Sequence, residues 1–366
     1  MDSRSWLLLE HEDPAYHLPD DLRQHDPLGA RDCGWVEQMR PFIRQFSRPG
    51  EQVLDPFCGF ASTLVAAHLE GRRGLGYEID PARAELSRER LRRLNAEGAE
   101  VIASDLLEAP PADPVDLCLT NIPYFGCDWP ADAGPAQLYA AAHYEQYLDG
   151  LVERFHRIRD LLAPGRHCIL MAENLRLGDR CVPLAWDVAQ RVGGLFELCE
   201  ERILLYPKPV EPLPAFSSRS DRSHEYALIF RKQGSTLDTD DALTLLRALR
   251  DAGFAFAIYG SFATWLTSTS AQPPADVDLL VAPDEDRLNA LLGWLQAHHF
   301  RLSCWQQSLT LPIALADYRG RYYFRAERLD RSGGLLRLDL TFEQDSEPVA
   351  ARLDRTQICQ GLLVAS

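Results

Sequence analysis

The first two thirds of the chain alternate short apolar runs with longer stretches in which apolar residues recur at helical spacing. The apolar runs predict strands near residues 52–55, 74–78, 100–103, 115–120, 166–172, 198–205 and 225–231. The stretches between them predict helices near residues 61–70, 81–95, 142–162 and 182–192. Regular alternation of strands and helices is typical of a mostly parallel sheet with helices on both faces. We therefore expect an α/β fold here.

A polar segment of small residues, 233–240, follows the last of these strands and predicts a linker. The pattern then starts again. It predicts helices near 239–252, 261–267 and 284–298, and strands near 255–259, 276–282, 320–326 and 334–342. We expect one domain over residues 1–232 and a second, smaller α/β domain over residues 239–366.

Composition narrows the class of protein. The 366 residues suffice for two domains, and no apolar run is long enough for a membrane span. The N-terminus lacks a signal-peptide pattern, and the nine cysteines contain no CxxC pair, so we expect a cytoplasmic protein without a zinc site or disulfide framework. The net charge of −16 counts against tight duplex binding, although a local positive cleft would be compatible with it.

Acidic residues follow three successive predicted strands. Residues 53–63 read VLDPFCGFAST, a strand that runs through Asp55 into a small-residue turn at Gly59. Glu78 ends the next strand, where an acid can bind both ribose hydroxyls of an adenosine ligand, and Asp105 follows the third, near the adenine edge. A glycine turn alone is weak evidence, and Asp105 alone fits a plain turn equally well. The three acids together predict an adenosine-type ligand at the carboxyl edge of the sheet.

The next predicted strand runs into residues 119–125, LTNIPYF. An amino group on a base is a poor nucleophile until its hydrogens are oriented. The amide oxygen of Asn121 and the carbonyl of Ile122 can accept those hydrogens, and Tyr124 can stack on the ring. Without the acids described above, a turn that closes a strand would explain this segment equally well.

These two segments resemble the amino methyltransferases of the N4-cytosine/N6-adenine group, with their Asp-Pro-Phe-x-Gly-Ser-Gly turn and Asp/Asn-Pro-Pro-Tyr motif. The resemblance covers about residues 20–232 and implies a Rossmann-like S-adenosylmethionine-dependent methyltransferase sheet. It implies cofactor binding by Asp55, Phe57, Gly59, Glu78 and Asp105, and catalysis by Asn121, Pro123 and Tyr124. The chain departs from the motifs at Phe60-Ala61, where the family has Ser-Gly, and at Ile122, where it has proline.

A second group of candidate residues lies in the C-terminal part. Gly260-Ser261 opens a predicted helix, Asp276 and Asp278 share one face of a strand, and Asp339 lies in a later strand. This order resembles the DNA-polymerase-β-type minimal nucleotidyltransferases. The resemblance implies nucleotide binding at Gly260 and Ser261, Mg²⁺ at the three aspartates and a nucleoside triphosphate as partner. No Lys or Arg for the triphosphate stands nearby, so a second activity stays open.

The leading hypothesis is a methyltransferase acting on an exocyclic amino group of a base in DNA or RNA, fused to a nucleotidyltransferase-like domain. The alternative is an S-adenosylmethionine-dependent transferase acting on a small molecule in specialised metabolism. The acidic charge, the departures at Phe60 and Ile122 and the lack of a long insertion for target recognition favour this alternative. A sensor without catalysis is a third reading.

Overall fold

A computed structural model describes residues 3–126, 137–209, 212, 223–232, 237–268, 274–305, 307–329, 334–344 and 347–365. The chain divides into two compact units, unit 1 over Met1–Lys232 and unit 2 over Gln233–Ser366. None of the helices in the described residues combines the length and the apolar character that a membrane crossing needs.

Unit 1 is built on an eight-stranded sheet with the order β1-β9-β10-β6-β5-β2-β3-β4. Neighbouring strands are parallel except at β10, which runs antiparallel to both β6 and β9. The strands are β1 (Trp6–Leu8), β2 (Gln52–Asp55), β3 (Arg73–Tyr77), β4 (Ala99–Ile102), β5 (Val115–Asn121), β6 (Leu162–Ala172), β9 (Glu197–Leu205) and β10 (His224–Arg231). The mostly parallel α/β sheet expected from the sequence is present.

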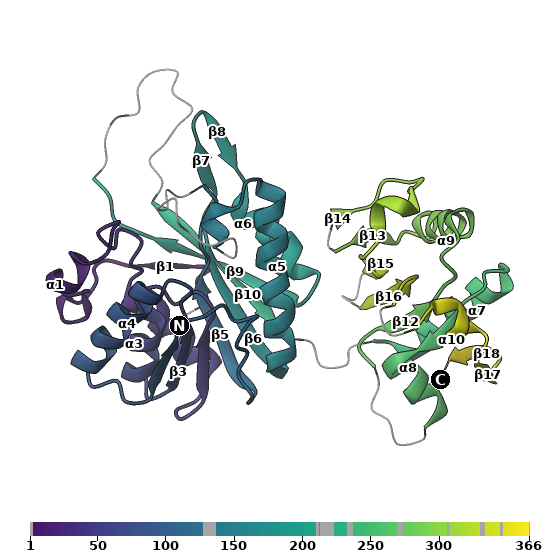
Figure 1. The fold of residues 1–366 in the computed structure, drawn as a ribbon, viewed down its shortest axis with the longest axis horizontal. Coiled ribbons are helices and arrows are strands. Elements are labelled where there is room, and N and C mark those ends of the chain that lie inside the picture. Colours follow the sequence, from purple (N-terminus) through teal and green to yellow (C-terminus); the bar gives the residue numbers. More distant parts are fainter. Residues whose placement is uncertain are drawn as a thin grey trace. The chain divides into compact units, whose positions relative to one another are not determined.

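Helices cover both faces of this sheet (Figure 1). The first face is covered by α2 (Val36–Phe46), α3 (Ser62–Leu69) and α4 (Pro81–Arg93), and the second by α5 (Tyr144–Leu161) and α6 (Leu184–Gly193). Each face has its own apolar core, because the buried side chains of α2 to α4 and those of α5 and α6 belong to separate clusters. The strands between them are therefore apolar on both sides, as parallel sheets require.

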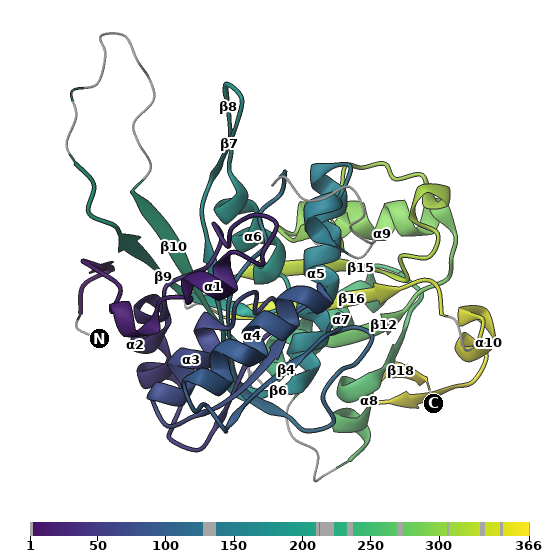
Figure 2. The same ribbon diagram turned by 60° about the vertical axis from the view of Figure 1, so that its left-hand side comes forward.

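Smaller elements decorate unit 1. The short helices are η1 (Pro14–Tyr16), α1 (Asp20–Arg23) and η2 (Leu138–Ala140). A two-stranded hairpin, β7 (Leu175–Leu177) with β8 (Arg180–Val182), projects from the unit (Figure 2). The sequence pattern predicted neither this hairpin nor β1, because strands of three residues carry too few positions for a periodic signal.

Unit 2 has an eight-stranded sheet of its own, in the order β14-β13-β15-β16-β12-β11-β18-β17. Its strands are β11 (Ala257–Tyr259), β12 (Val277–Leu280), β13 (Arg301–Cys304), β14 (Gln307–Ser308), β15 (Tyr323–Leu329), β16 (Leu335–Thr341), β17 (Thr356–Cys359) and β18 (Leu362–Ala365). Its helices are α7 (Thr239–Asp251), α8 (Gly260–Thr267), α9 (Glu285–Ala297), α10 (Val349–Leu353) and the short η3 (Leu315–Tyr318). The described part of unit 2 thus mixes helices with a largely antiparallel sheet.

Candidate cofactor and acceptor site

The turn after β2 places Asp55 at the carboxyl edge of the sheet. Gly59, with φ +49°, continues the turn into α3 through a backbone conformation that favours glycine. Asp55 is 3% exposed, and its Oδ1 accepts hydrogen bonds from the Phe57 amide at 3.1 Å and from the Thr120 hydroxyl of β5 at 2.5 Å. Burial raises the pKa of Asp55 to about 6, and these hydrogen bonds oppose the rise. A buried carboxylate that has no cationic partner among the described residues is thus held beside the turn.

Glu78 follows β3 and lies next to the same turn. The Cys58 amide donates to the Tyr77 carbonyl at 2.8 Å, and a Cβ on Gly76 would lie 2.8 Å from Cys58, so only glycine allows the turn to approach β3 this closely. Glu78 is 8% exposed and accepts a hydrogen bond from the Asp80 amide at 2.8 Å. Burial raises its pKa to about 7. The tips of β2 and β3 therefore present two buried carboxylates with raised pKa values to the same side of the turn.

Asp105, the third predicted acid, is engaged by protein groups. Its Oδ1 accepts from the Leu107 amide at 2.9 Å, and its Oδ2 forms an ion pair with Arg154 of α5, whose Nε lies 2.9 Å away. Both side chains are nearly inaccessible to solvent. The carboxylate therefore links the end of β4 to α5, and its role in binding a ligand stays a prediction.

Asn121 ends β5, and its amide group faces the helix α2 on the first face of the sheet. Its Oδ1 accepts from Gln38 Nε2 at 3.4 Å. A Cβ on Gly34 would lie 2.5 Å from Asn121 Nδ2, so the glycine leaves the space that this side chain occupies. Tyr147 of α5 donates to the Pro123 carbonyl at 2.6 Å and fixes the backbone after the strand. The amide and the following turn are therefore held in one orientation.

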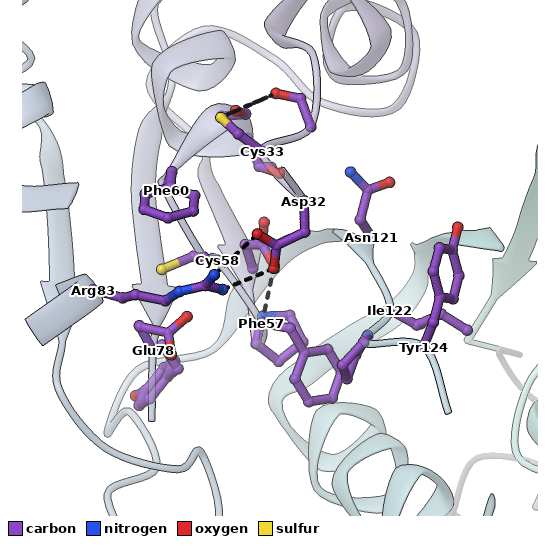
Figure 3. A pocket seen from close by; sticks show the side chains of 18 of the residues that line it. Asp32, Cys33, Phe57, Cys58, Phe60, Glu78, Arg83, Asn121, Ile122 and Tyr124 are labelled. Atoms are coloured by element: carbon purple, nitrogen blue, oxygen red, sulfur yellow. Dashed lines mark hydrogen bonds and ion pairs between the residues drawn. The ribbon is translucent and has the colours of Figure 1, made fainter. Parts of the chain in front are cut away.

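One cavity of about 480 Å³ joins the two sets of residues. Figure 3 shows Glu78 and Arg83 on one side of it and Asn121 with Tyr124 on the other. The predicted residues that line it are Asp55, Phe57, Gly59, Glu78, Asp105, Asn121, Pro123 and Tyr124. Burial raises the pKa of the Tyr124 hydroxyl, which therefore stays protonated. The structure thus brings the cofactor motif and the acceptor motif to a single cavity.

The departures from the family motif leave this cavity open. The ring of Phe60 packs into a small cluster with Leu18, Leu22 and Ala30, and the Arg83 guanidinium lies 4.7 Å from the ring centroid. Ala61 takes the left-handed conformation, φ +64°, where the family has glycine, at a cost of about 1 kcal/mol. Phe60 therefore borders the cavity without filling it.

Two groups of cavity residues were not predicted. In the first, Arg83 forms ion pairs with Asp26 and Asp32, which fixes the segment before α2 as one wall (Figure 3). In the second, Glu225 of β10 accepts hydrogen bonds from Gln38 and from Tyr206. Glu225 stands out in the sequence as a charged residue at the start of an otherwise mostly apolar strand, but only the pairing of β10 with β6 and β9 shows where it lies.

Unit 2 brings Gly260, Asp278 and Asp339 of its predicted residues together. Asp278 of β12 is the direct neighbour of Asp339 on β16, and a Cβ on Gly260 would lie 2.4 Å from Asp278 Oδ2. However, Arg325 of β15 binds both carboxylate oxygens of Asp339, at 2.8 and 2.7 Å.

In the described residues, no group of three acidic, histidine or cysteine side chains is arranged to hold a metal ion. Asp276 precedes β12, and Ser261 lies in the first turn of α8. The structure therefore gives no support to the Mg²⁺ site predicted at Asp276, Asp278 and Asp339, because a guanidinium already pairs with Asp339. The likeness of unit 2 to nucleotidyltransferases stays a prediction.

Comparison with known proteins finds methyltransferases that match short parts of this chain. Similar curated proteins include a tRNA (guanine(10)-N2)-dimethyltransferase of Methanothermobacter thermautotrophicus, 38% identical over 77 residues, which are 21% of this chain and 23% of that protein. The Type II methyltransferase M.MjaI of Methanocaldococcus jannaschii is 34% identical over 77 residues, 21% of this chain and 25% of that protein. The chain thus matches about a quarter of the length of these relatives.

Matches among solved structures include TrmN from Thermus thermophilus, 17% identical with a TM-score of 0.37, covering 54% of this chain and 49% of that one. An rRNA methylase from Streptococcus thermophilus is 14% identical with a TM-score of 0.36, covering 54% of this chain and 97% of that one.

The family model described as DNA methylase matches residues 36–89, from α2 through the turn at Gly59 into α4. The resemblance to the N4/N6-type amino methyltransferases, first seen in the motifs, is confirmed for this segment.

Proposed function

We propose that unit 1 is an S-adenosylmethionine-dependent methyltransferase that modifies an exocyclic amino group of a nucleic-acid base. The observation that carries the proposal is the single cavity in which Asp55 and Glu78 face Asn121 and Tyr124. The similarity of residues 36–89 to DNA methylases supports it, as do relatives whose names describe a tRNA methyltransferase and a Type II methyltransferase.

The cavity fits the cofactor by its charge and its size. Its volume of about 480 Å³ lies within the range of pockets for ligands of this size. Asp55 and Glu78 have pKa values raised by burial, so a cationic ligand or a pair of hydroxyl donors would relieve the unfavourable environment of these carboxylates. We propose that Glu78 accepts hydrogen bonds from the ribose and that Asp55 borders the cationic part of the ligand.

Bound S-adenosylmethionine supplies an electrophilic methyl group. The protein's contribution is to place an amino nitrogen in line with it. Asn121 Oδ1 accepts a hydrogen bond from the amino group, which turns the nitrogen lone pair toward the methyl group, and Tyr124 packs against the ring of the base. Gln38 and Tyr147 hold this arrangement through the Asn121 amide and the Pro123 carbonyl.

Transfer of labelled methyl groups to bulk DNA and bulk RNA tests the proposal. We expect Asn121→Ala to lower the rate at least 100-fold, about 3 kcal/mol of positioning, while binding of S-adenosylhomocysteine is unchanged. Asn121→Asp keeps an acceptor oxygen and should retain more activity than the alanine variant. Gln24→Ala removes an exposed amide away from the cavity and serves as the control. Full transfer by Asn121→Ala would refute the assigned role.

The net charge of −16 favours the second candidate, a small-molecule acceptor in the same cavity. The same assay separates the two. The small-molecule acceptor would be favoured if the protein binds the cofactor, transfers no methyl group to DNA or RNA, and methylates small amines in a way that depends on Asn121. For unit 2 we propose no two-metal nucleotidyl transfer, because Arg325 occupies the Asp339 carboxylate.

A further inference from the structure

We propose that Glu225 accepts a hydrogen bond from a ring N–H of the base that is methylated. Together with Asn121, it would select a base that has N–H donors on both its amino group and the adjacent ring nitrogen, as guanine does. The inference rests on the proposed function and deepens it, because it names the class of base. It assigns a specificity role to a residue that lies outside both sequence motifs.

A single amide nitrogen places Glu225 beside the acceptor motif. Gln38 Nε2 lies 2.7 Å from Glu225 Oε2 and 3.4 Å from Asn121 Oδ1, so it bridges the two oxygens. Glu225 and Asn121 both line the cavity that contains Tyr124. A base stacked on Tyr124 with its amino group at Asn121 would therefore present its neighbouring ring nitrogen to Glu225.

The hydrogen bonds of Glu225 leave one oxygen for a ligand. Its Oε2 accepts from Gln38 and, at 3.1 Å, from the Tyr206 hydroxyl. Tyr206 is fixed by edge-to-face packing on Trp35, with ring centroids 5.4 Å apart. Within the described part of the chain, Oε1 of Glu225 has no hydrogen-bond partner. Burial raises the pKa of Glu225, whereas the hydrogen bonds from Tyr206 and Gln38 favour the carboxylate.

The Glu225 carboxylate and Asn121 Oδ1 together offer the ligand only hydrogen-bond acceptors. A carboxylate and an amide oxygen cannot donate, so their matching ligand carries donors on adjacent atoms. Guanine offers N1–H next to its amino group. Adenine and cytosine instead place an unprotonated ring nitrogen there, whose lone pair would face the carboxylate. A site with such buried polar groups rejects a base that leaves them unpaired. A protonated Glu225 would reverse the preference, which makes the identity of the product decisive.

The test uses the full chain with labelled S-adenosylmethionine and bulk RNA and DNA as acceptors, followed by digestion and identification of the methylated nucleoside. We expect methylation at the guanine amino group. Glu225→Gln should lower this transfer about 10- to 100-fold, the contribution of a hydrogen bond to a charged group, and leave S-adenosylhomocysteine binding unchanged. Glu201→Gln is the matched control, because it removes the same charge from an exposed position on β9.

A single-stranded oligonucleotide of uracils with one guanine gives a sharper measurement, because uracil has no exocyclic amino group. Replacing this guanine with 1-methylguanine removes the ring donor and should abolish transfer. Methylation of adenine or cytosine in preference to guanine, or normal transfer by Glu225→Gln, would overturn the inference and leave the proposed function intact. Absence of transfer to every nucleic acid would overturn both.

Discussion

The raised pKa of Glu78 makes cofactor affinity depend on pH in a predictable direction. A carboxyl group that accepts hydrogen bonds from a ribose must be ionised to do so fully, and burial raises the pKa of Glu78 from 4.5 to about 7. The affinity for S-adenosylhomocysteine should therefore rise as the pH increases through 7. An ordinary glutamate would be ionised throughout this range and would give a flat profile.

The size of the effect follows from the titration. A group with a pKa of 7 is about 90% ionised at pH 8 and about 10% ionised at pH 6, so the affinity should fall about tenfold, or about 1.4 kcal/mol, between these values. Asp55, whose pKa is raised to about 6, steepens the loss below pH 6. Calorimetry at constant ionic strength measures this profile. Glu78→Gln should bind more weakly at pH 8 and show a flatter profile. An unchanged slope in this variant would refute the reasoning.

Without cofactor, the raised pKa of Glu78 has the opposite effect: the free energy of unfolding falls as the pH rises. The folded state binds the Glu78 proton more tightly than the unfolded state, so this residue's unfavourable contribution is absent below pH 4.5 and grows as the pH rises toward 7. Its limit is about 3 kcal/mol, because the pKa rises from 4.5 to about 7 and each unit is worth about 1.4 kcal/mol. Urea unfolding at pH 8 should therefore find Glu78→Gln more stable than the parent chain, and the difference should vanish below pH 4.5. A less stable variant at pH 8 would contradict the sign.

Further predictions concern fixed contacts. Gly34→Ala should lower methyl transfer at least tenfold without changing cofactor affinity, because its Cβ would lie 2.5 Å from Asn121 Nδ2. Measuring the transfer rates of Gly34→Ala and Asn121→Ala side by side checks this. Arg154→Leu should destabilise unit 1 by about 3–5 kcal/mol in urea unfolding, because it leaves the buried Asp105 carboxylate without its cation. Asp339→Asn should destabilise unit 2 to a similar extent, since it removes the carboxylate that neutralises a buried arginine, and Mg²⁺ should not shift the thermal unfolding of the parent chain.

Local signals in the sequence sufficed for the two motifs and their supporting strands. The turn at Gly59 and the acid at Glu78 lie next to strands whose bounds differ from the predicted ones by at most a residue or so. A single strand and the turn after it determine where such residues stand, because all parallel strands end at the same edge of the sheet. The meeting of Asp55 and Asn121 in one cavity follows from the same rule.

Contacts between distant segments could not be predicted in this way. Arg154 lies 49 residues from Asp105 and Arg325 lies 14 residues from Asp339, and in each case the partner depends on helix orientation or strand register. The residue type alone does not show whether an aspartate binds a ligand or an arginine. The sequence therefore predicted Asp105 and Asp339 as ligand-binding residues, whereas the structure pairs each of them with a guanidinium.

The partners of the cavity carboxylates offer a physical criterion that separates structural acids from candidate ligand-binding ones. Asp105 is neutralised by Arg154 and needs no ligand. Asp55, Glu78 and Glu225 instead accept hydrogen bonds from hydroxyl, amide or backbone N–H groups, and within the described residues none of them forms an ion pair. Burial raises the pKa of all three, so each carries a cost that folding alone does not relieve. Such groups persist where a bound ligand offsets the cost, and all three line one cavity beside Asn121.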